Sequence, residues 1–344
     1  AAIRPADAAA MDAARRRQAQ LAKPPGSLGK LEDISVQLAG ITGHIDNEIE
    51  KTRIYVLAAD NGVVAEGVSS APQSVTRQQA INLTRGVTGA SAIARHFGDE
   101  LVVVDVGIAE DYTCPQIVNR RIARGTKNIA KEPAMTVQQA LTALDTGMTL
   151  AAQAKRDGVT ALGVGEMGIG NTTTSAAVLM ALTGCALEDA VGRGGGVTDE
   201  AFARKRAVVA GALANLRLDA NDAVDVLAKV GGFDLAAMAG VFLGAAESRL
   251  PVVIDGFISV VAALCAVRLC PAARDFLFSS HGSFERGYAV AARALSLTPV
   301  LTLDMRLGEG SGCPLGFRVL EAACAAMNGM ATFEDARIDD GYLA

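Results

Sequence analysis

The stretch "VTALGVGEMGIGNTTTSAAV", residues 159–178, joins an apolar run to a glycine-rich turn and a polar helix start. The apolar run 159–165 is continuous rather than alternating, which is typical of a parallel strand buried on both faces. The Asn-Thr-Thr-Thr that follows the glycines is typical of a helix N-terminus, with Asn171 or Thr172 as the N-cap. The stretch therefore predicts a strand–turn–helix unit, from which doubly wound α/β folds are built.

The same alternation extends along the chain on both sides of this stretch. Continuous apolar runs that end in glycine or a polar loop occupy residues 53–60, 101–107, 159–165, 251–256, 275–280 and 299–305. Helical patterns occupy residues 74–98, 136–158, 172–184, 198–217, 233–249, 256–270 and 283–297. Because strand–helix–strand crossovers are right-handed and join parallel strands, we predict an α/β fold with a doubly wound, mainly parallel sheet.

The sequence pattern predicts only helices at the two ends of the chain. They flank the sheet-forming region, so we expect them to pack together. The predicted organisation is a small helical domain formed by residues 1–48 and 318–344, and an α/β substrate-binding and catalytic domain formed by residues 49–317.

The amino-acid composition limits the classes of protein to which this sequence can belong. The 344 residues are 50% hydrophobic but only 4% aromatic, so we expect a sizeable core in which small residues stand where elements touch. The net charge of −5 argues against a nucleic-acid partner, because phosphate backbones attract clustered Lys and Arg. Three isolated histidines and six cysteines without a C-x-x-C pair show no metal-ligand spacing.

The sequence also predicts a soluble, cytoplasmic protein without a membrane partner. The longest apolar run, residues 256–267, is short of the roughly 20 residues that span a bilayer. The first 20 residues lack the apolar centre of a signal peptide. Cysteines within apolar runs are typical of free thiols in a reducing compartment.

Polar side chains follow the predicted strands at the points where the strands end. They are Asp60, Asp105, Glu166, Asp255, residues 279–281 and residues 306–309. In open α/β sheets, ligands bind beyond the carboxyl ends of the strands. We therefore expect these groups to converge on one edge of the sheet.

Two glycine-rich segments are candidate anion sites. In residues 163–178 the helix start supplies free N–H groups and the positive end of the helix dipole, and Glu166 is placed to hold ribose hydroxyls. The segment lacks the lysine of a P-loop and the G-x-G-x-x-G spacing of a dinucleotide site, and a plain glycine-rich turn is the alternative. In residues 191–209, Lys205 or Arg206 either adds positive charge to an anion or belongs to a solvated helix face.

Other strand ends carry groups with two interpretations. Asp255 either lines the site or caps the following helix. Ser283 and His281 either offer a hydroxyl and an imidazole or serve in helix capping, and a lone histidine is more often structural than catalytic.

Glu309 lies in "LTLDMRLGEGSG", residues 301–312, between glycines. A carboxylate in so poorly solvated a loop suits a general base near neutral pH. The alternative is an ordinary loop acid or a cap for the helix expected near Gly312. Without a Ser-His or Cys-His pair, covalent nucleophilic catalysis is disfavoured, and without clustered acids so is metal-dependent transfer. A phosphate anchor with one base fits displacement at a sugar carbon by a nucleophile that loses a proton.

Eight segments, in order along the chain, carry a resemblance to a known family. They are "KPPGSLGKLE" (23–32), "AADNGVVAEGVSSAPQSVT" (58–76), "TRGVTGAS" (84–91), "VVDVGI" (103–108), "GVGEMGIGNTT" (163–173), "VLAKVGGFDLAAMAGVFLGAA" (226–246), "PVVIDGF" (251–257) and "MRLGEGSG" (305–312). Together they resemble the nicotinate-nucleotide:dimethylbenzimidazole phosphoribosyltransferase family over almost the whole chain. One segment is a weak signal, whereas eight collinear segments are specific.

The resemblance implies an enzyme that assembles the lower ligand of cobalamin. Such enzymes transfer the ribose 5-phosphate of β-nicotinate mononucleotide to 5,6-dimethylbenzimidazole, which yields α-ribazole 5′-phosphate and nicotinate. The glutamate of the family's "GEGSG" segment is the general base, and it corresponds to Glu309. It removes the benzimidazole N–H proton while the other ring nitrogen attacks C1′ with inversion. The resemblance also implies a Rossmann-like large domain, a small helical domain from both termini, a homodimer, and no metal or redox cofactor.

The resemblance further implies a set of substrate-binding residues. They are Gln79, Glu166, Met167, Gly168, Ile169, Gly170, Asn171, Thr172, Lys205, Asp255, Ser283, Leu307 and Gly308. Within this set, residues 166–172 resemble the ribose-phosphate loop, Lys205 and Ser283 resemble phosphate contacts, and Gln79 resembles part of the benzimidazole wall.

Two residues depart from the family pattern. Asn61 stands where some members have histidine, and Ala71 stands where some have serine. The missing hydroxyl at Ala71 implies looser selectivity for the base. The physiological base therefore stays open among 5,6-dimethylbenzimidazole, other benzimidazoles, adenine and phenolic bases.

Two other functions compete with the transferase. A dinucleotide-dependent oxidoreductase needs a G-x-G-x-x-G turn after the first strand, where "AADNGVVAEG" (58–67) stands instead, and an acid about 20 residues further on. A nucleotide-sensing or partner-binding protein would keep the phosphate loop but would have no need of Glu309.

Overall fold

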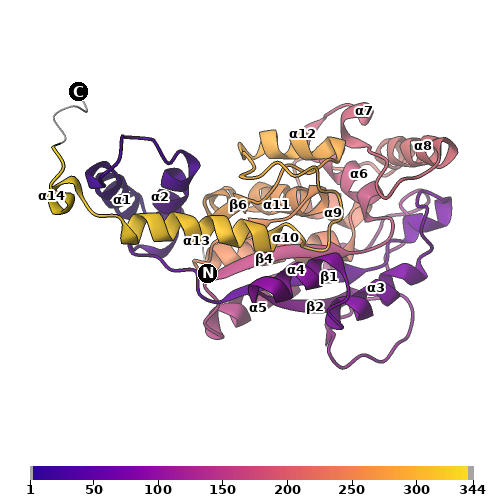
Figure 1. Cartoon of the computed structure of the whole chain (residues 1–344). Helices are drawn as coiled ribbons and strands as arrows, with labels where there is room; N and C mark the ends of the chain where they lie inside the picture. The colour runs from indigo at the N-terminus through magenta and orange to yellow at the C-terminus, as the bar shows by residue number, and fades with distance from the viewer. Residues whose placement is uncertain (1–2, 340–344) are drawn as a thin grey trace.

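One six-stranded sheet forms the centre of the protein, whose computed structural model describes residues 3–339 (Figure 1). The strands are β1 (Thr52–Ala59), β2 (Glu100–Gly107), β3 (Val118–Asn119), β4 (Ala161–Met167), β5 (Val252–Ile254) and β6 (Leu277–Ser279). They stand in the order β3-β2-β1-β4-β5-β6, and all neighbours are parallel. This order confirms the predicted doubly wound α/β fold, and it is that of Rossmann-like sheets, in which the winding reverses between β1 and β4.

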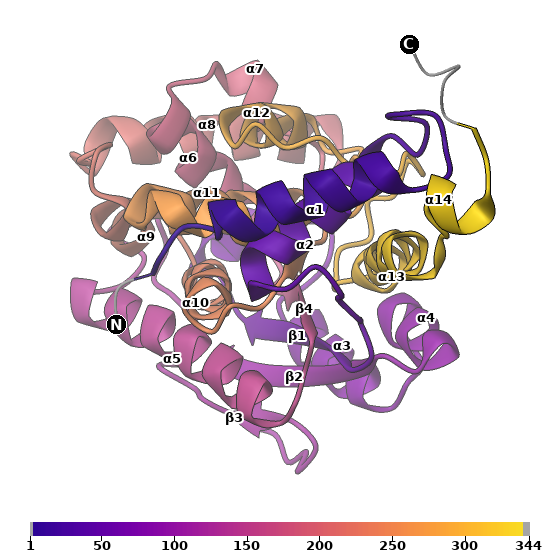
Figure 2. The same ribbon diagram turned by 90° about the vertical axis from the view of Figure 1, so that its left-hand side faces the viewer.

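Helices connect the strands and cover both faces of the sheet. The α-helices are α1 (Ala8–Gln20), α2 (Lys30–Thr42), α3 (Ser74–Thr84), α4 (Gly89–Phe97), α5 (Val137–Arg156), α6 (Asn171–Thr183), α7 (Leu187–Ala190), α8 (Asp199–Asn215), α9 (Ala223–Val230), α10 (Phe233–Glu247), α11 (Phe257–Leu269), α12 (Arg286–Ala294), α13 (Cys313–Gly329) and α14 (Phe333–Ala336). Two 3-10 helices are η1 (Gly62–Glu66) and η2 (Pro271–Phe276). Helices α5, α10 and α11 lie on one face of the sheet, and α3, α4 and α13 lie on the other (Figure 2).

The strands differ from the prediction at two places. Residues 299–305 do not form a strand: Leu301 makes a single bridge to His281, and the left-handed conformation of Asp304 (φ 51°) ends the extended segment. Strand β3 was not predicted, because two residues are too few to show a hydrophobic pattern. The other five predicted strands are confirmed, and every residue of β1 is buried, as its continuous apolar sequence indicated.

The helix predicted over residues 74–98 is divided into α3 and α4. Gly86 between them adopts a φ of 74°, which a continuing helix does not allow. Thr88 then caps α4 through a capping box with Ser91. The single-helix prediction is therefore wrong at this point.

Segments near the two chain ends meet in a second hydrophobic cluster. Helices α1 and α2 pack against each other, and α2 packs against α13 (Figure 1). The buried residues of this cluster are Ala14, Leu21, Val36, Ala39 and Met327. The helical ends therefore share a core that is separate from the core around the sheet.

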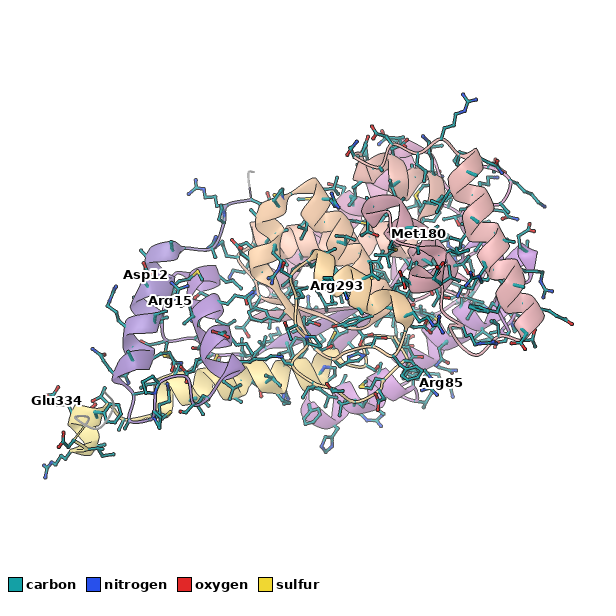
Figure 3. All side chains as sticks on the ribbon, turned by 90° about the horizontal axis from the view of Figure 1, so that it is seen from above. Asp12, Arg15, Arg85, Met180, Arg293 and Glu334 are labelled. Carbon is teal, nitrogen blue, oxygen red and sulfur yellow. The ribbon has the colours of Figure 1, made fainter. Side chains whose placement is uncertain are left out.

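The outer side of this helical region faces solvent. Figure 3 labels Asp12 and Arg15 on α1, whose side chains are 61% and 57% exposed. Helix α13 continues from Cys313 to Gly329, through the predicted boundary at residue 318. The division into a helical domain and an α/β domain stays a prediction. Residues 1–2 and 340–344 of the predicted helical domain lie outside the described residues. No helix among residues 3–339 combines the length and the apolar composition needed to cross a membrane.

Helices α5 and α10 approach each other so closely that only glycine fits at their contact. A Cβ atom on Gly147 would overlap the carbonyl oxygen of Ala237, and one on Gly240 would overlap that of Leu144. These contacts confirm that small residues stand where elements touch. An interior packed at this density does not accept an added methyl group without a backbone shift.

We expect Gly240→Ala to reduce the free energy of unfolding by about 1–3 kcal/mol, because the new methyl group must displace the α5 backbone. The matched control is Gly211→Ala on α8, where an added Cβ meets no atom within 4 Å. The control should gain roughly 0.5–1 kcal/mol, since alanine favours the helix more than glycine does. Urea unfolding of both variants measures the difference, and equal effects would contradict the tight α5–α10 contact.

Candidate active site

A cavity of about 260 Å³ lies at the carboxyl ends of β4, β5 and β6. Most of the predicted substrate-binding residues line it: Glu166, Met167, Gly168, Ile169, Gly170, Asn171, Thr172, Asp255, Ser283, Leu307 and Gly308. The other three predicted residues do not line the cavity. Lys205 is hydrogen-bonded to Thr172 of the lining, whereas Gln79 and Glu309 are hydrogen-bonded to each other, with Glu309 directly after Gly308 of the lining. The fold thus brings together groups that lie far apart in the sequence.

Two of the acids expected at this edge of the sheet, Asp60 and Asp105, lie outside the cavity. Asp60 accepts a hydrogen bond from the Ala109 N–H group at 2.8 Å, and Asp105 pairs with Arg121 and with the Tyr112 hydroxyl. Neither acid lines the cavity. They hold the loops that follow β1 and β2, so their convergence on the site is not observed.

The loop between β4 and α6 brings backbone amides to the cavity. Helix α6 begins at Asn171, and its N-cap is Gly170 with a φ of 94°, so the predicted side-chain cap by Asn171 or Thr172 is wrong. The Asn171 side chain instead donates one hydrogen bond to Glu166 and another to Asp234, the latter at 3.1 Å. The start of α6 is left without a side-chain cap, which is what an anion site at a helix N-terminus requires.

Lys205 reaches the same helix start from α8. It is 1% exposed, and its Nζ atom donates a hydrogen bond to Thr172 Oγ1 at 2.8 Å. Burial lowers the pKa of Lys205 to about 8, although the charge of Glu285 opposes this. Arg206 lies instead over the ring of Phe202, 5.9 Å from its centre. Of the two basic residues considered, Lys205 joins the site and Arg206 does not.

Glu309 stands on a loop of left-handed residues. Its φ is 64°, between values of 80° for Gly308 and 82° for Gly310. Oε1 accepts a hydrogen bond from Gln79 at 2.8 Å, whereas Oε2 is buried without a partner. The N-cap of α13 is Gly312 and has no side-chain cap, which excludes the capping alternative. A fixed carboxylate with one unpaired oxygen is suited to accept a proton.

Asp255 follows β5 and bonds to the same loop. Its Oδ1 atom accepts a hydrogen bond from the Gly312 N–H group at 2.7 Å, and Oδ2 accepts one from the Gly310 N–H group at 3.0 Å. The N-cap of α11 is Gly256, so Asp255 does not cap that helix. Burial raises the pKa of Asp255 to about 7 against the effect of the two amide bonds, and the charge of Glu309 adds to the rise.

Glu166 shares its buried surroundings with other acids. Burial raises the pKa of Glu166 to about 8, the hydrogen bond from Asn171 lowers it, and the charges of Asp234 and Asp255 raise it further. Burial likewise raises the pKa of Asp234 to about 6. Near neutral pH the Glu166 carboxyl is therefore mainly protonated.

Asp234 is a residue of this cluster that the sequence analysis missed. It is fully buried at the start of α10 and accepts hydrogen bonds from Asn171 and, at 3.5 Å, from Asn61. A signal was present in the sequence, because Asp234 is the single acid within the otherwise apolar segment 233–246. An isolated acid in an apolar helix indicates a buried polar contact.

His281, for which the sequence left both a functional and a capping role open, lines the cavity and is 2% exposed. Ser280 Oγ donates its proton to the Ile254 carbonyl at 2.7 Å. The contact between Ser280 Oγ and His281 Nδ1, at 3.0 Å, therefore requires a proton on Nδ1. Burial lowers the pKa of His281, which favours a neutral ring with Nε2 as a hydrogen-bond acceptor.

The remaining residues singled out in the sequence also have defined places. Ser283 lines the cavity, and α12 begins after Glu285, which provides no side-chain cap. Ala71 lines the cavity as well, whereas Asn61 is buried outside this lining. Among residues 3–339, no group of three or more His, Cys, Asp or Glu side chains is arranged to hold a metal ion.

The fold is a Rossmann-like sheet, and its site combines a glycine-rich, uncapped helix start, a buried lysine and a buried carboxylate. A family model described as "Phosphoribosyltransferase" matches residues 3–338. The nicotinate-nucleotide–dimethylbenzimidazole phosphoribosyltransferase of Clostridium perfringens is 53% identical over 96% of this chain and 91% of its own length. The enzyme of the same name from Acetivibrio thermocellus is 49% identical over 96% and 94%.

A solved structure agrees with these relatives. The crystal structure of CobT from Thermus thermophilus superposes with a TM-score of 0.93 at 43% identity, over 97% of this chain and all of that one. The chain belongs to the nicotinate-nucleotide–dimethylbenzimidazole phosphoribosyltransferase family. The resemblance of the eight sequence segments is thereby confirmed.

The raised pKa of Glu166 leads to a prediction about stability. The neutral carboxyl stabilises the fold fully below pH 4.5, and this contribution is lost as the pH rises through about 8. Glu166→Gln stays neutral and still accepts the bond from Asn171. The Tm of the variant relative to wild type should therefore increase from about pH 5 to about pH 8.5, by roughly 1–2 °C for each kcal/mol recovered.

Thermal unfolding in phosphate-free buffers measures this difference, and Glu32→Gln is the control. Although burial alone would raise it, the pKa of Glu32 is lowered, chiefly through its hydrogen bond with Lys23. The charged Glu32 carboxylate stabilises the fold fully above pH 4.5. Glu32→Gln should therefore lower the Tm by the same amount at every pH from about 5 to about 8.5. A constant offset for Glu166→Gln would contradict the prediction.

Proposed function

We propose that this enzyme transfers the ribose 5-phosphate of β-nicotinate mononucleotide to 5,6-dimethylbenzimidazole, giving α-ribazole 5′-phosphate and nicotinate. The names of its relatives support these substrates. The observation that carries the proposal is the Glu309 carboxylate, with Oε1 held by Gln79 and Oε2 buried without a partner. The product would serve in assembly of the lower ligand of cobalamin.

The phosphate of the mononucleotide binds at the start of α6 in this proposal. Lys205 and Thr172 are joined there by a hydrogen bond, and Ser283 lines the same cavity. An ammonium group and uncapped helix N–H groups together favour a phosphate dianion. The glycines of residues 168–170 let the backbone approach the ribose phosphate.

The acceptor base binds near Gln79 and Glu309. Leu307, on the loop that carries Glu309, and Ala71 both line the cavity and offer apolar surface to a flat ring. Ala71 lacks a hydroxyl that would select among bases, so other benzimidazoles, adenine and phenolic bases are candidate acceptors as well.

The chemical step is a displacement at C1′. Glu309 accepts the N–H proton of the benzimidazole, and the lone pair of the other ring nitrogen forms the new bond to C1′. The bond from C1′ to the nicotinate nitrogen breaks, and its electron pair stays on the nicotinate ring. Attack from the face opposite nicotinate inverts C1′ from β to α, and no metal or redox cofactor takes part in these steps.

We further infer that the enzyme works in the cytoplasm as a homodimer on small-molecule substrates. The net charge of −5 does not favour nucleic acid. The segment 58–67 lacks the dinucleotide fingerprint, so no observation favours an oxidoreductase.

Glu309→Gln is expected to lower kcat by about 10²–10⁴, the contribution typical of a general base. The amide keeps an oxygen for Gln79 but does not accept the proton, so binding of the mononucleotide should be largely unchanged. Purified enzyme is mixed with nicotinate mononucleotide and 5,6-dimethylbenzimidazole, and chromatography follows nicotinate and α-ribazole phosphate together. Near-normal turnover of the variant would remove Glu309 as the base. Nicotinate release by wild type without the α-riboside would show hydrolysis or a different acceptor.

Lys205→Ala should weaken binding of the mononucleotide by about 10- to 100-fold, because it removes a charged hydrogen-bond donor to the phosphate. Since the pKa of Lys205 is about 8, the affinity of the wild type should fall as the pH rises above this value, and the variant should lose this dependence. Arg206→Ala is the control, since Arg206 contacts Phe202 instead. Isothermal titration at several pH values makes the comparison, and equal affinities for the two variants would exclude Lys205 from the phosphate site.

A further inference from the structure

The loop that carries Glu309 needs support from its surroundings. Gly308, Glu309 and Gly310 all have φ values in the left-handed region. This conformation costs a non-glycine residue about 1–2 kcal/mol. Glu309 therefore keeps its place only if neighbouring elements fix the loop.

Two strands provide this support, one through the lack of a side chain and the other through a carboxylate. A Cβ on Gly165 of β4 would overlap the Gly310 nitrogen, so the loop lies directly on the strand. Asp255, at the end of β5, accepts hydrogen bonds from the Gly310 and Gly312 N–H groups at 3.0 and 2.7 Å. Each carboxylate oxygen thus binds one loop amide, and both amides follow Glu309 within three residues.

We propose that Asp255 is a positioning residue for Glu309, and that it fixes the left-handed loop through these two amide bonds rather than by binding the mononucleotide. This inference rests on the proposed function, and it gives Asp255 a different role from the substrate contact that the family resemblance implied.

The geometry favours positioning over substrate binding. Asp255 is 2% exposed although it lines the cavity. Two of the roughly four acceptor positions of this carboxylate are occupied by loop amides, and its burial restricts the access of a ribose hydroxyl to the others. The Gln79 hydrogen bond fixes one Glu309 oxygen, and Asp255 fixes the backbone beside it, so the two contacts together determine where Oε2 lies.

Asp255→Asn tests the proposal, because an amide offers one acceptor oxygen and places an N–H₂ group against the other loop amide. We expect kcat to fall by about 10- to 100-fold, as for a displaced catalytic group, with the dissociation constant of the mononucleotide changed by less than about twofold. A large loss of affinity with normal kcat would overturn the proposal. A general structural role would not separate kcat from binding in this way.

A double variant tests whether Asp255 acts through Glu309. If it does, Asp255→Asn combined with Glu309→Gln should be about as slow as Glu309→Gln alone, since residues that act as a unit are not additive. Overnight product accumulation measures these residual rates. A further 10- to 100-fold loss in the double variant would show an independent role and overturn the proposal.

Hydrogen exchange separates this inference from the proposed function. The amides of residues 310–312 should exchange roughly tenfold faster in Asp255→Asn, the effect of losing about one hydrogen bond. Asp234→Asn is the matched control, because Asp234 is equally buried but bonds to Asn171 and Asn61, and it should leave this exchange unchanged. If the wild type makes no α-riboside, the proposed function fails while the exchange still decides the loop contact. Unchanged exchange in Asp255→Asn would refute the contact itself.

Discussion

Buried carboxyl groups held by hydrogen bonds at the carboxyl edge of the sheet determine how this site is built. Removing a carboxylate from water is costly unless donors replace the lost solvation. Asn171 supplies such donors to Glu166 and Asp234, and backbone amides of one loop supply them to Asp255. The cationic group lies elsewhere, where Lys205 meets Thr172. The buried acids and the buried lysine therefore occupy separate parts of the site.

The sheet makes this arrangement possible because its backbone approaches other elements without intervening side chains. Gly165 lets the Glu309 loop rest on β4, and Gly163 of the same strand lies against Cys313 at the start of α13. The same device recurs between α5 and α10, at Gly147 and Gly240. A chain poor in aromatic residues thus builds a dense interior by bringing backbones together rather than by filling space with large side chains.

Much of the fold was predictable from the local pattern of apolar, glycine and polar residues. Continuous apolar runs indicated β1, β2 and β4–β6, and glycines before a polar helix start indicated the loop and helix start at residues 166–172, which line the cavity. The local sequence pattern did not predict hydrogen bonds between residues far apart in the chain, such as those between Asp255 and Gly312 and between Asn171 and Asp234. No local signal distinguishes Lys205 from Arg206, since only the direction in which each leaves α8 decides which one is buried. Residues 299–305 were wrongly predicted as a strand, because the left-handed conformation of Asp304 ends the extended segment despite its apolar sequence.

Helix α13 has a consequence for how sequence can change in this family. It starts at Cys313, immediately after the Glu309 loop, and its far end contributes Met327 to the core shared with the terminal helices. The helix is a rigid rod of about 26 Å, and one inserted or deleted residue would rotate one end against the other by about 100°. Either Met327 would leave its core or the Glu309 carboxylate would turn away. The length of α13 is thus fixed from both ends, so its residues can vary but their number cannot.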